Sequence, residues 1–482
     1  MTSEKPFQNG LFAPQDIGSR VPADHLLRKI AQVLDLSFVN HAVESKYGAV
    51  GNQSVPPTRI MKLLLLLVIY NVPSERALFR DLPMRIDWLW FLGFDLSSRL
   101  PNHSVLSKAR KRWGEAVFLD LFARTIEMCL KAGLIDGRHM LADSSLIDAN
   151  ASIDSLFRTA QDIAASAASR LEPTEDEPAE GSSGQGDGGS EEPGQAPREP
   201  KYRSRTDPDA TGAKRRGETR VRPRYQTHRA VDSAHGVITA STIGPGHENE
   251  ATRLEKLVFE HCEHTGRRLE SVTADSKYGT ADNLEFCEVN HIDAFIVPYR
   301  SSYTRPKEGR FRECCFRYDA DRDVYWCPAG EPLKRLGYRA DKDAIRYGAQ
   351  ASACKTCSVR AQCTSARGGR MVQRPVRVEI LERARVRMRT ERGREQKKLR
   401  RWMMEGSFAH SVRLGYKRAR ARGQRNMQIQ DYLVAAVQNL LILVRAKGQN
   451  AQKAAQGCSL RLRIAVCAQI TRLRLIAAMR FA

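Results

Sequence analysis

The sequence predicts a mixed α/β fold with one sheet that is antiparallel at one side and parallel at the other. Two β-prone stretches joined by the turn Asp232-Ser-Ala-His-Gly236 form a hairpin, and the strands after it alternate with helical patterns. Such alternation places consecutive strands side by side in parallel. The strands are expected at 138–143, 225–231, 237–243, 271–274 and 294–298, and the helices at 248–262 and 281–291.

Residues 52–135, which precede this sheet, are predicted to form a helical domain. The run 63–69 is the most apolar, but it is far shorter than the ~20 residues that span a bilayer, so it is expected to be a buried helix. In the helix 103–113 an apolar stripe is formed by Val105, Leu106, Ala109 and Trp113. The basic residues beside that stripe fit DNA in the manner of a helix-turn-helix second helix, and a solvated charged face explains them equally well.

Charge narrows the class of partner. The formal net charge of +23 combines −8 in residues 171–200 with +31 in the rest of the chain. A field of this sign and size favours a polyanion, with nucleic acid ahead of an anionic membrane. Eleven cysteines, an odd number, and an N-terminus without the apolar core of a signal peptide predict a reducing, cytoplasmic location.

Composition divides the chain into successive segments. Residues 171–200 are rich in Glu, Gly, Ser and Pro and are predicted to be a disordered linker inserted into the sheet domain. In chain order the segments are the N-terminal segment 1–51, the helical domain 52–135, the first part of the sheet domain 136–170 and 201–303, interrupted by the acidic linker 171–200, a cysteine-rich insertion 304–374, the last part of the sheet domain 375–445, and a basic amphipathic tail 446–482.

Two of the predicted strands end in an aspartate. The strand 271–274 runs into Asp275, and the strand 138–143 runs into Asp143. Reacting groups of open α/β sheets collect at the carboxyl ends of the strands, so both aspartates are candidate catalytic residues. An aspartate before a turn also serves as a helix N-cap, which is the alternative for Asp275.

A third acid lies in the basic segment 375–425, which holds seventeen Lys or Arg against five acids. One helical face there carries Arg401, Glu405, Phe408 and Val412. A carboxylate facing inward on so basic a helix needs a partner, either a metal ion or a salt bridge to Arg401. Glu395 is the next candidate should Glu405 not serve. The following helix, 427–444, is expected to be amphipathic and to pack across the sheet.

The insertion 304–374 shows no strand or helix periodicity and holds six of the eleven cysteines. The two-residue gap of Cys354-Lys-Thr-Cys357 lets two thiolates share a tetrahedral Zn²⁺, and Cys327 and Cys363 would complete four ligands. A loop of free or redox-tunable thiols is the alternative.

The three acids suggest a reaction. Hard divalent cations prefer carboxylate oxygens, and two such ions ~3.5–4 Å apart activate an attacking water or hydroxyl in phosphoryl transfer. The positive charge of the chain points to nucleic acid as the substrate. Phosphodiester chemistry on DNA is therefore the leading hypothesis.

The ordered set of motifs resembles that of the DDE transposases of bacterial insertion sequences. The motifs are Pro56-Pro57-Thr-Arg, Asp143-Ser-Ser-Leu-Ile-Asp-Ala, Asp275-Ser-Lys-Tyr-Gly and Arg401-x-x-x-Glu405-x-x-Phe408. The likeness covers roughly residues 50–445 and is closest to the subgroup with a C-P-x-G … C-x-x-C insertion. Lys398 and Val412 stand where the helical signature of related transposases has a Tyr and a Lys, so the phosphate contacts of those two positions are not carried over.

The resemblance implies an RNase H-like core in which Asp143, Asp275 and Glu405 bind two Mg²⁺ ions, with Mn²⁺ as a substitute. Water would nick the end of the element, and the freed 3′-hydroxyl would attack target DNA without ATP. The helical domain would read terminal inverted repeats of double-stranded DNA, and the working form would be a DNA-bound homodimer at the bacterial nucleoid, with no membrane partner. The candidate DNA contacts are Lys108, Arg110, Lys111, Arg112, Arg401, Arg413, Lys417 and Arg418.

Three other functions fit parts of the sequence. A metal-dependent nuclease with the same core would cut DNA without joining it. A non-catalytic DNA-binding relic would keep the basic surface alone. A membrane-surface protein would rely on the tail 446–482.

Overall fold

The computed structural model contains two compact units. Unit 1 comprises Met1–Leu134, Arg413–Gly415 and Tyr432–Ala482, and unit 2 comprises Ile135–Val412 and Tyr416–Asp431. The described residues are 17–47, 54–159, 199–299, 310–340 and 343–449. Most of the predicted linker 171–200 and of the tail 446–482 lies outside these residues, so both stay predictions, as does the division into segments.

Unit 1 is helical. Its helices are α1 (Leu26–Ala31), α2 (Ser37–Val43), α3 (Pro57–Ile69), α4 (Glu75–Asp81), α5 (Ile86–Leu92), α6 (Ser104–Trp113) and α7 (Ala116–Lys131). α3 packs against α2, α5 and α6 and buries every residue from Leu63 to Val68, which confirms the predicted buried helix. The predicted stripe of α6 is confirmed as well, because Leu106, Ala109 and Trp113 are buried.

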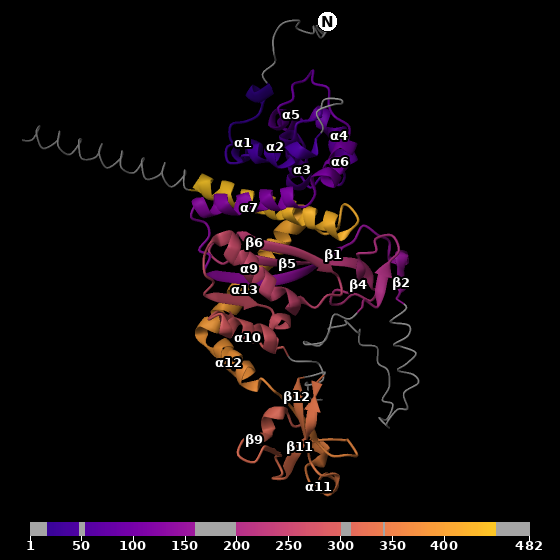
Figure 1. Cartoon of the computed structure of the whole chain (residues 1–482), viewed down its shortest axis with the longest axis vertical. Coiled ribbons are helices and arrows are strands. Elements are labelled where there is room, and N and C mark those ends of the chain that lie inside the picture. The colour runs from indigo at the N-terminus through magenta and orange to yellow at the C-terminus, as the bar shows by residue number, and fades with distance from the viewer. Residues whose placement is uncertain (1–16, 48–53, 160–198, 300–309, 341–342, 450–482) are drawn as a thin grey trace, which may run out of the picture. The chain divides into compact units, whose positions relative to one another are not determined.

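Unit 2 contains the predicted mixed sheet (Figure 1). Its five central strands are β1 (His139–Asp148), β5 (Arg222–Asp232), β6 (Ile238–Pro245), β7 (Ser271–Ala274) and β8 (Asp293–Phe295). They lie in the order β6-β5-β1-β7-β8. β5 is antiparallel to β1 and to β6, whereas β1, β7 and β8 are parallel neighbours, as predicted. This is an RNase H-like sheet. It is extended beside β5 by β2 (Leu156–Arg158), β3 (Tyr202–Ser204) and β4 (Thr211–Ala213).

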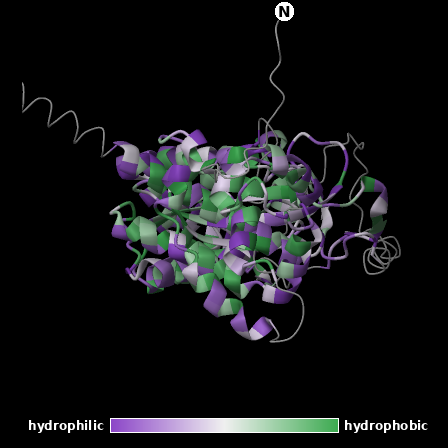
Figure 2. Ribbon diagram, turned by 90° about the horizontal axis from the view of Figure 1, so that it is seen from above, coloured by the Kyte–Doolittle hydropathy of each residue, from purple (hydrophilic) through white to green (hydrophobic). Residues whose placement is uncertain are grey.

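Helices cover both faces of this sheet. They are α9 (Leu254–Thr265), α10 (Ala281–Val289), α12 (Val378–Arg389) and α13 (Glu391–Arg413). The first three share an apolar cluster with Met140 and Ala142 of β1. Asp143 points to the opposite face, because side chains alternate along a strand, and there it meets Arg400 of α13. In Figure 2 single helices carry both green and purple residues, as expected for elements with one buried face.

The cysteine-rich insertion is more regular than the sequence predicted. It forms an antiparallel sheet in the order β13-β12-β11-β10-β9. The strands are β9 (Arg317–Asp319), β10 (Val324–Trp326), β11 (Pro332–Arg339), β12 (Ala344–Gly348) and β13 (Met371–Pro375), and α11 (Ala351–Lys355) follows β12. The expectation of no regular structure was wrong because these strands are short and partly exposed on both faces, which leaves no alternating pattern.

The helix Gln424–Gln449 differs from the amphipathic helix that was predicted. It is the one helix of the described part that is long and apolar enough to cross a membrane, and 89% of its apolar window is buried in the protein. Polar side chains within the helix are buried as well, and hydrogen bonds compensate for their burial. Gln428 Oε1 accepts from the Ile243 N–H at 2.8 Å, and Gln428 Nε2 donates to the Ser241 carbonyl at 3.2 Å. These bonds satisfy backbone groups along β6, a strand with a free edge.

A fully buried carboxylate, Asp431, connects four segments of unit 2. Its oxygens accept hydrogen bonds from Arg229 Nη2 at 3.2 Å, Thr227 Oγ1 at 3.2 Å, Ser241 Oγ at 2.5 Å and Tyr416 Oη at 2.5 Å. Arg229 is also fully buried. Because a buried ion is costly without a partner, the charges on Asp431 and Arg229 depend on each other.

We expect Asp431→Ala to lower the free energy of unfolding by about 3–5 kcal/mol, because it leaves the Arg229 charge buried without its carboxylate. Glu199→Ala is the matched control, since Glu199 pairs with Arg203 at the surface of the same unit. The control should change stability by less than about 1 kcal/mol. Urea unfolding followed by circular dichroism measures both, and equal effects of the two substitutions would contradict the prediction.

Candidate metal and DNA site

The structure brings Asp143 and Asp275 to the same edge of the sheet. β1 and β7 are parallel neighbours in which Ala142 is opposite Ala274. Asp143 and Asp275 follow these two alanines, so they occupy equivalent positions where β7 ends beside β1. β1 itself continues past the predicted strand 138–143 as far as Asp148, so Asp143 lies within its strand and only Asp275 follows the end of one.

The guanidinium of Arg400 contacts both carboxylates. Its Nη1 donates to Asp143 Oδ2 at 2.7 Å, and its Nη2 lies 3.7 Å from Asp275 Oδ1. The Arg400 side chain is only 15% exposed, so this contact is sheltered from water. One cationic group thus lies between two acids, and the carboxylate oxygens face a common point.

Asp143 lies in an environment that disfavours its charge. Burial raises its pKa to about 6, against the opposing effects of Arg400 and of the Ser144 N–H. The neighbouring acids Asp275 and Glu250 raise the pKa further. A cation that binds at this edge would relieve the cost of ionising Asp143.

Asp275 does not use its carboxylate as a helix cap. It precedes the 3₁₀-helix Ser276–Tyr278, but its side chain makes no capping hydrogen bond. The Asp275 side chain is 42% exposed. Its oxygens are therefore accessible, and the N-cap alternative does not account for them.

Glu405 does not face inward as the sequence predicted. It is 69% exposed and pairs with Arg401 at 3.1 Å, which was the salt-bridge alternative. The buried face of α13 is one residue out of phase with the predicted one, and it carries Arg400, Met404 and Ser411. No contact among the described residues joins Glu405 to the two aspartates. Glu395, the second choice, is exposed as well.

Glu250 is an acid of this region that the sequence analysis missed. Its side chain is 8% exposed, accepts from Lys277 Nζ at 2.6 Å and accepts from Gln226 Nε2 at 2.9 Å. Gln226 Nε2 also donates to Ser144 Oγ at 2.9 Å, beside Asp143. Glu250 follows β6, which runs in the same direction as β1. The position of Glu250 after a strand could have marked it as a candidate, but only the direction of β6 in the sheet shows that it lies on the same side as Asp143.

The predicted DNA contacts of α6 belong to unit 1. Lys108, Lys111 and Arg112 are exposed there. Arg110 is different, because its side chain is only 16% exposed and forms an ion pair with Glu75. Three of the four basic side chains are thus accessible to a phosphate backbone.

The other predicted contacts follow α13 or lie on it. Arg401, Arg413, Lys417 and Arg418 are exposed. The turn that carries Lys417 and Arg418 is fixed beside the end of β1, because the Asp148 N–H donates to the Lys417 carbonyl at 3.2 Å and the Ala419 N–H donates to the Asp148 carbonyl at 2.8 Å. These two basic residues of unit 2 therefore lie near the end of β1, the strand that carries Asp143.

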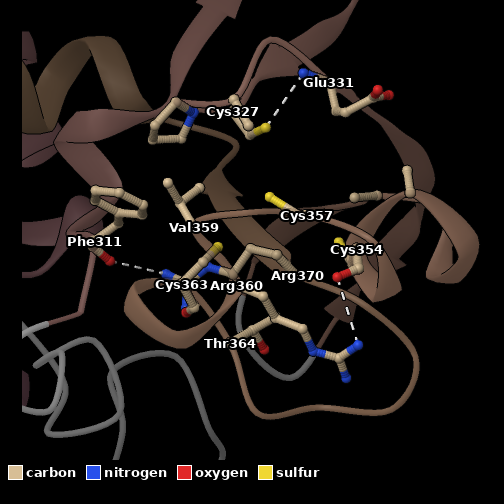
Figure 3. A pocket seen from close by; sticks show the side chains of 14 residues that line it. Phe311, Cys327, Glu331, Cys354, Cys357, Val359, Arg360, Cys363, Thr364 and Arg370 are labelled. Carbon is tan, nitrogen blue, oxygen red and sulfur yellow. Dashed lines mark hydrogen bonds between the residues drawn. The ribbon is translucent and has the colours of Figure 1, made fainter.

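The four candidate zinc ligands lie close together in the insertion. Cys327, Cys354, Cys357 and Cys363 line one hollow (Figure 3). Burial raises the pKa of the Cys363 thiol, Arg370 opposes this, and the other three thiols raise the pKa further. In the described part of the chain, no three His, Cys, Asp or Glu side chains are arranged as ligands of one metal ion.

The raised pKa of Asp143 predicts a pH dependence of stability without added Mg²⁺. The folded protein binds this proton more tightly than the unfolded chain, whose Asp pKa is near 3.8. The stabilisation is therefore full below about pH 4 and is lost as the pH rises through about 6, by up to about 3 kcal/mol. Asp143→Asn should remove this component in urea unfolding at pH 4.5 and 7.5. Identical pH profiles for the two proteins would contradict it.

Comparisons with known proteins found two family models that match parts of the chain. A model described as "Transposase domain (DUF772)" matches residues 15–112, and a model described as "Transposase DDE domain" matches residues 326–444. The second match includes Arg400 and Glu405. A search of curated proteins found no match.

Solved structures give weaker likenesses. The Mos1 transposase paired-end complex with left transposon end is 10% identical over 53% of this chain and 63% of that chain, with a TM-score of 0.16. The Mos1 strand transfer complex is 12% identical over 52% and 62%, also with a TM-score of 0.16. The chain thus spans less than two thirds of the length of these proteins. The two family models, both of transposase domains, match successive parts of one chain whose sheet is RNase H-like.

Proposed function

We propose that this protein is the transposase of a bacterial insertion sequence and that it cleaves and joins DNA at the edge of the sheet that holds Asp143 and Asp275. One observation carries the proposal: two aspartates at neighbouring positions on the parallel strands β1 and β7, Asp143 within β1 and Asp275 just after β7, share a single guanidinium. The net charge of +23 supports DNA as the substrate.

The donors at this edge fit a hard divalent cation. Asp143 and Asp275 offer carboxylate oxygens, which Mg²⁺ prefers, and both already face one positive group. We expect them to hold Mg²⁺ as a pair of ions, with Mn²⁺ as a substitute. When bound, such ions activate the attacking hydroxyl and stabilise the charge on the leaving oxygen.

The chain's own residues would hold and orient the DNA. The exposed Lys417 and Arg418 lie beside Asp148, five residues along β1 from Asp143, and suit DNA phosphates at some distance from the cleaved bond. Lys108, Lys111 and Arg112 of α6 suit the terminal inverted repeats. We expect a DNA-bound homodimer in the bacterial cytoplasm and no membrane partner.

Substitution of the two aspartates tests the proposal. Asp143→Asn and Asp275→Asn should each lower Mg²⁺-dependent cleavage of an inverted-repeat end by roughly 10³-fold or more, because one ligand oxygen becomes a neutral amide. DNA affinity in a filter-binding assay should stay within about twofold, since phosphate contacts supply most of it. Asp154→Asn, at an exposed aspartate of the same unit, is the control and should keep full activity.

The same assay separates transposition from the alternatives. A labelled 3′-hydroxyl end incubated with plasmid and Mg²⁺ should yield a joined product. Nicks without joining would favour a nuclease, and unchanged activity in both aspartate variants would favour a non-catalytic DNA-binding protein.

We propose Glu405 as the third ligand, on the family resemblance and on its accessibility. Its surface pair with Arg401 contributes less than about 1 kcal/mol, so the carboxylate is free to change partner. Glu250, in contrast, is buried and already bonded to Lys277 and Gln226. Its role is to hold those side chains beside Asp143.

A matched pair of variants distinguishes these two acids. Glu405→Gln should lower cleavage roughly as much as Asp143→Asn, by about 10³-fold or more, with stability nearly unchanged. Glu250→Gln should destabilise the protein by about 1–3 kcal/mol, because it weakens a buried charge-assisted network, and should retain measurable cleavage. The reverse pattern in cleavage and urea-unfolding assays would assign the third ligand to Glu250.

A further inference from the structure

Four cysteines from separate turns of the insertion reach one small hollow. Cys327 follows β10, Cys354 lies in α11, and Cys357 and Cys363 follow α11 (Figure 3). The cavity volume is about 20 Å³. A volume of about 10–15 Å³ on this measure holds a single water, so there is room for one ion and little else.

The backbone around Cys327 is arranged to bond its sulfur. In the turn Cys327-Pro-Ala-Gly330, the Gly330 N–H donates to the Cys327 carbonyl at 2.9 Å, and the Cys327 N–H donates to the Glu331 carbonyl at 3.0 Å. The Glu331 N–H then points at Cys327 Sγ at 3.3 Å. Gly330 has φ +84°, a conformation that favours glycine. An N–H directed at sulfur stabilises a thiolate.

Two arginines hold the cysteine segments and supply positive charge. Arg360 Nη1 donates to the Cys354 carbonyl at 3.5 Å, and Arg370 Nη1 donates to the Cys363 carbonyl at 3.3 Å. Four thiolates around one divalent cation carry a net charge of −2. Nearby guanidinium groups offset that charge, as outer-shell partners do in metal sites.

The insertion has a small apolar core. Its buried cluster consists of Phe316, Leu333, Tyr347, Cys363 and Val372. A module with so little apolar burial usually needs a disulfide or a metal for stability. The described cysteines form no disulfide, so they are available as metal ligands, and a bound metal would add to the stability of this small core.

We propose that Cys327, Cys354, Cys357 and Cys363 bind one structural Zn²⁺. The inference goes beyond the proposed DNA chemistry, which takes place at a different site. Sulfur ligands at about 2.3 Å in a closed tetrahedral set are typical of structural zinc. Binding of the ion would draw the four sulfurs that line the hollow to that distance, and each thiol proton would be released to solvent.

Zinc content of the full-length, untagged chain tests this assignment. Inductively coupled plasma mass spectrometry should find about one Zn²⁺ per chain in the wild type, as for a closed four-ligand site. Cys327→Ser and Cys354→Ser should lower the content at least fivefold. Cys314→Ser and Cys315→Ser are matched controls, because these cysteines are exposed in the same insertion outside the hollow, and both should keep the metal.

A conservative variant distinguishes loss of a zinc ligand from misfolding of the insertion. Cys357→His should retain Zn²⁺, since imidazole is also a zinc ligand. Zinc at background level in the wild type, iron in its place, or equal loss in the Cys314→Ser control would overturn the assignment. The measurement needs no DNA, so its failure leaves the proposed transposase activity intact, and an inactive protein that holds zinc leaves this inference intact.

Discussion

Much of the arrangement of unit 2 depends on the buried carboxylate of Asp431. It binds side chains from β5, β6 and the turn after α13, and it belongs to the helix Gln424–Gln449. Arg229, its ionic partner, is the register partner of Asp143 on the neighbouring strand. The interaction that anchors the helix therefore also fixes the strand beside the candidate catalytic strand. We infer that it specifies one arrangement, since any other would leave a buried charge without its partner.

Arg400 gives the acid site a cation of its own. Two carboxylates close together repel each other, and burial together with the neighbouring acids raises the pKa of Asp143 to about 6. The guanidinium offsets both effects in the absence of a metal. A divalent ion that binds the same oxygens has to compete with Arg400 for them. The proposed metal binding would thus depend on the position of one side chain on α13.

The fold could be predicted where local patterns are strong. The central strands of unit 2 are apolar runs between turn signals and helices, so their succession along the chain and the antiparallel and parallel sides of the sheet could be predicted, whereas their spatial order comes from the structure. The insertion could not be predicted in the same way. β9 and β10 have three residues each, and their side chains are partly exposed, so no period of two is visible. Only the cysteine spacing marked this region, and it indicated chemistry rather than secondary structure.

Prediction of the site failed where it needed phase or topology. One residue along a helix turns the side chain by about 100°, so assigning Arg401 in place of Arg400 to the buried face put Glu405 inside and hid the contact with Asp143. Recognising Glu250 as an acid of this region required the direction of β6 in the sheet, which the sequence alone did not give. Asp143 and Asp275 needed neither, because each follows an apolar run and the two runs pair in parallel as β1 and β7. The expected end of the first strand was wrong, since β1 continues to Asp148, but the position of Asp143 beside Asp275 does not depend on that end. Acids that follow a buried strand segment are therefore easier to place from sequence than acids on a helix, whose placement requires the rotation of the helix.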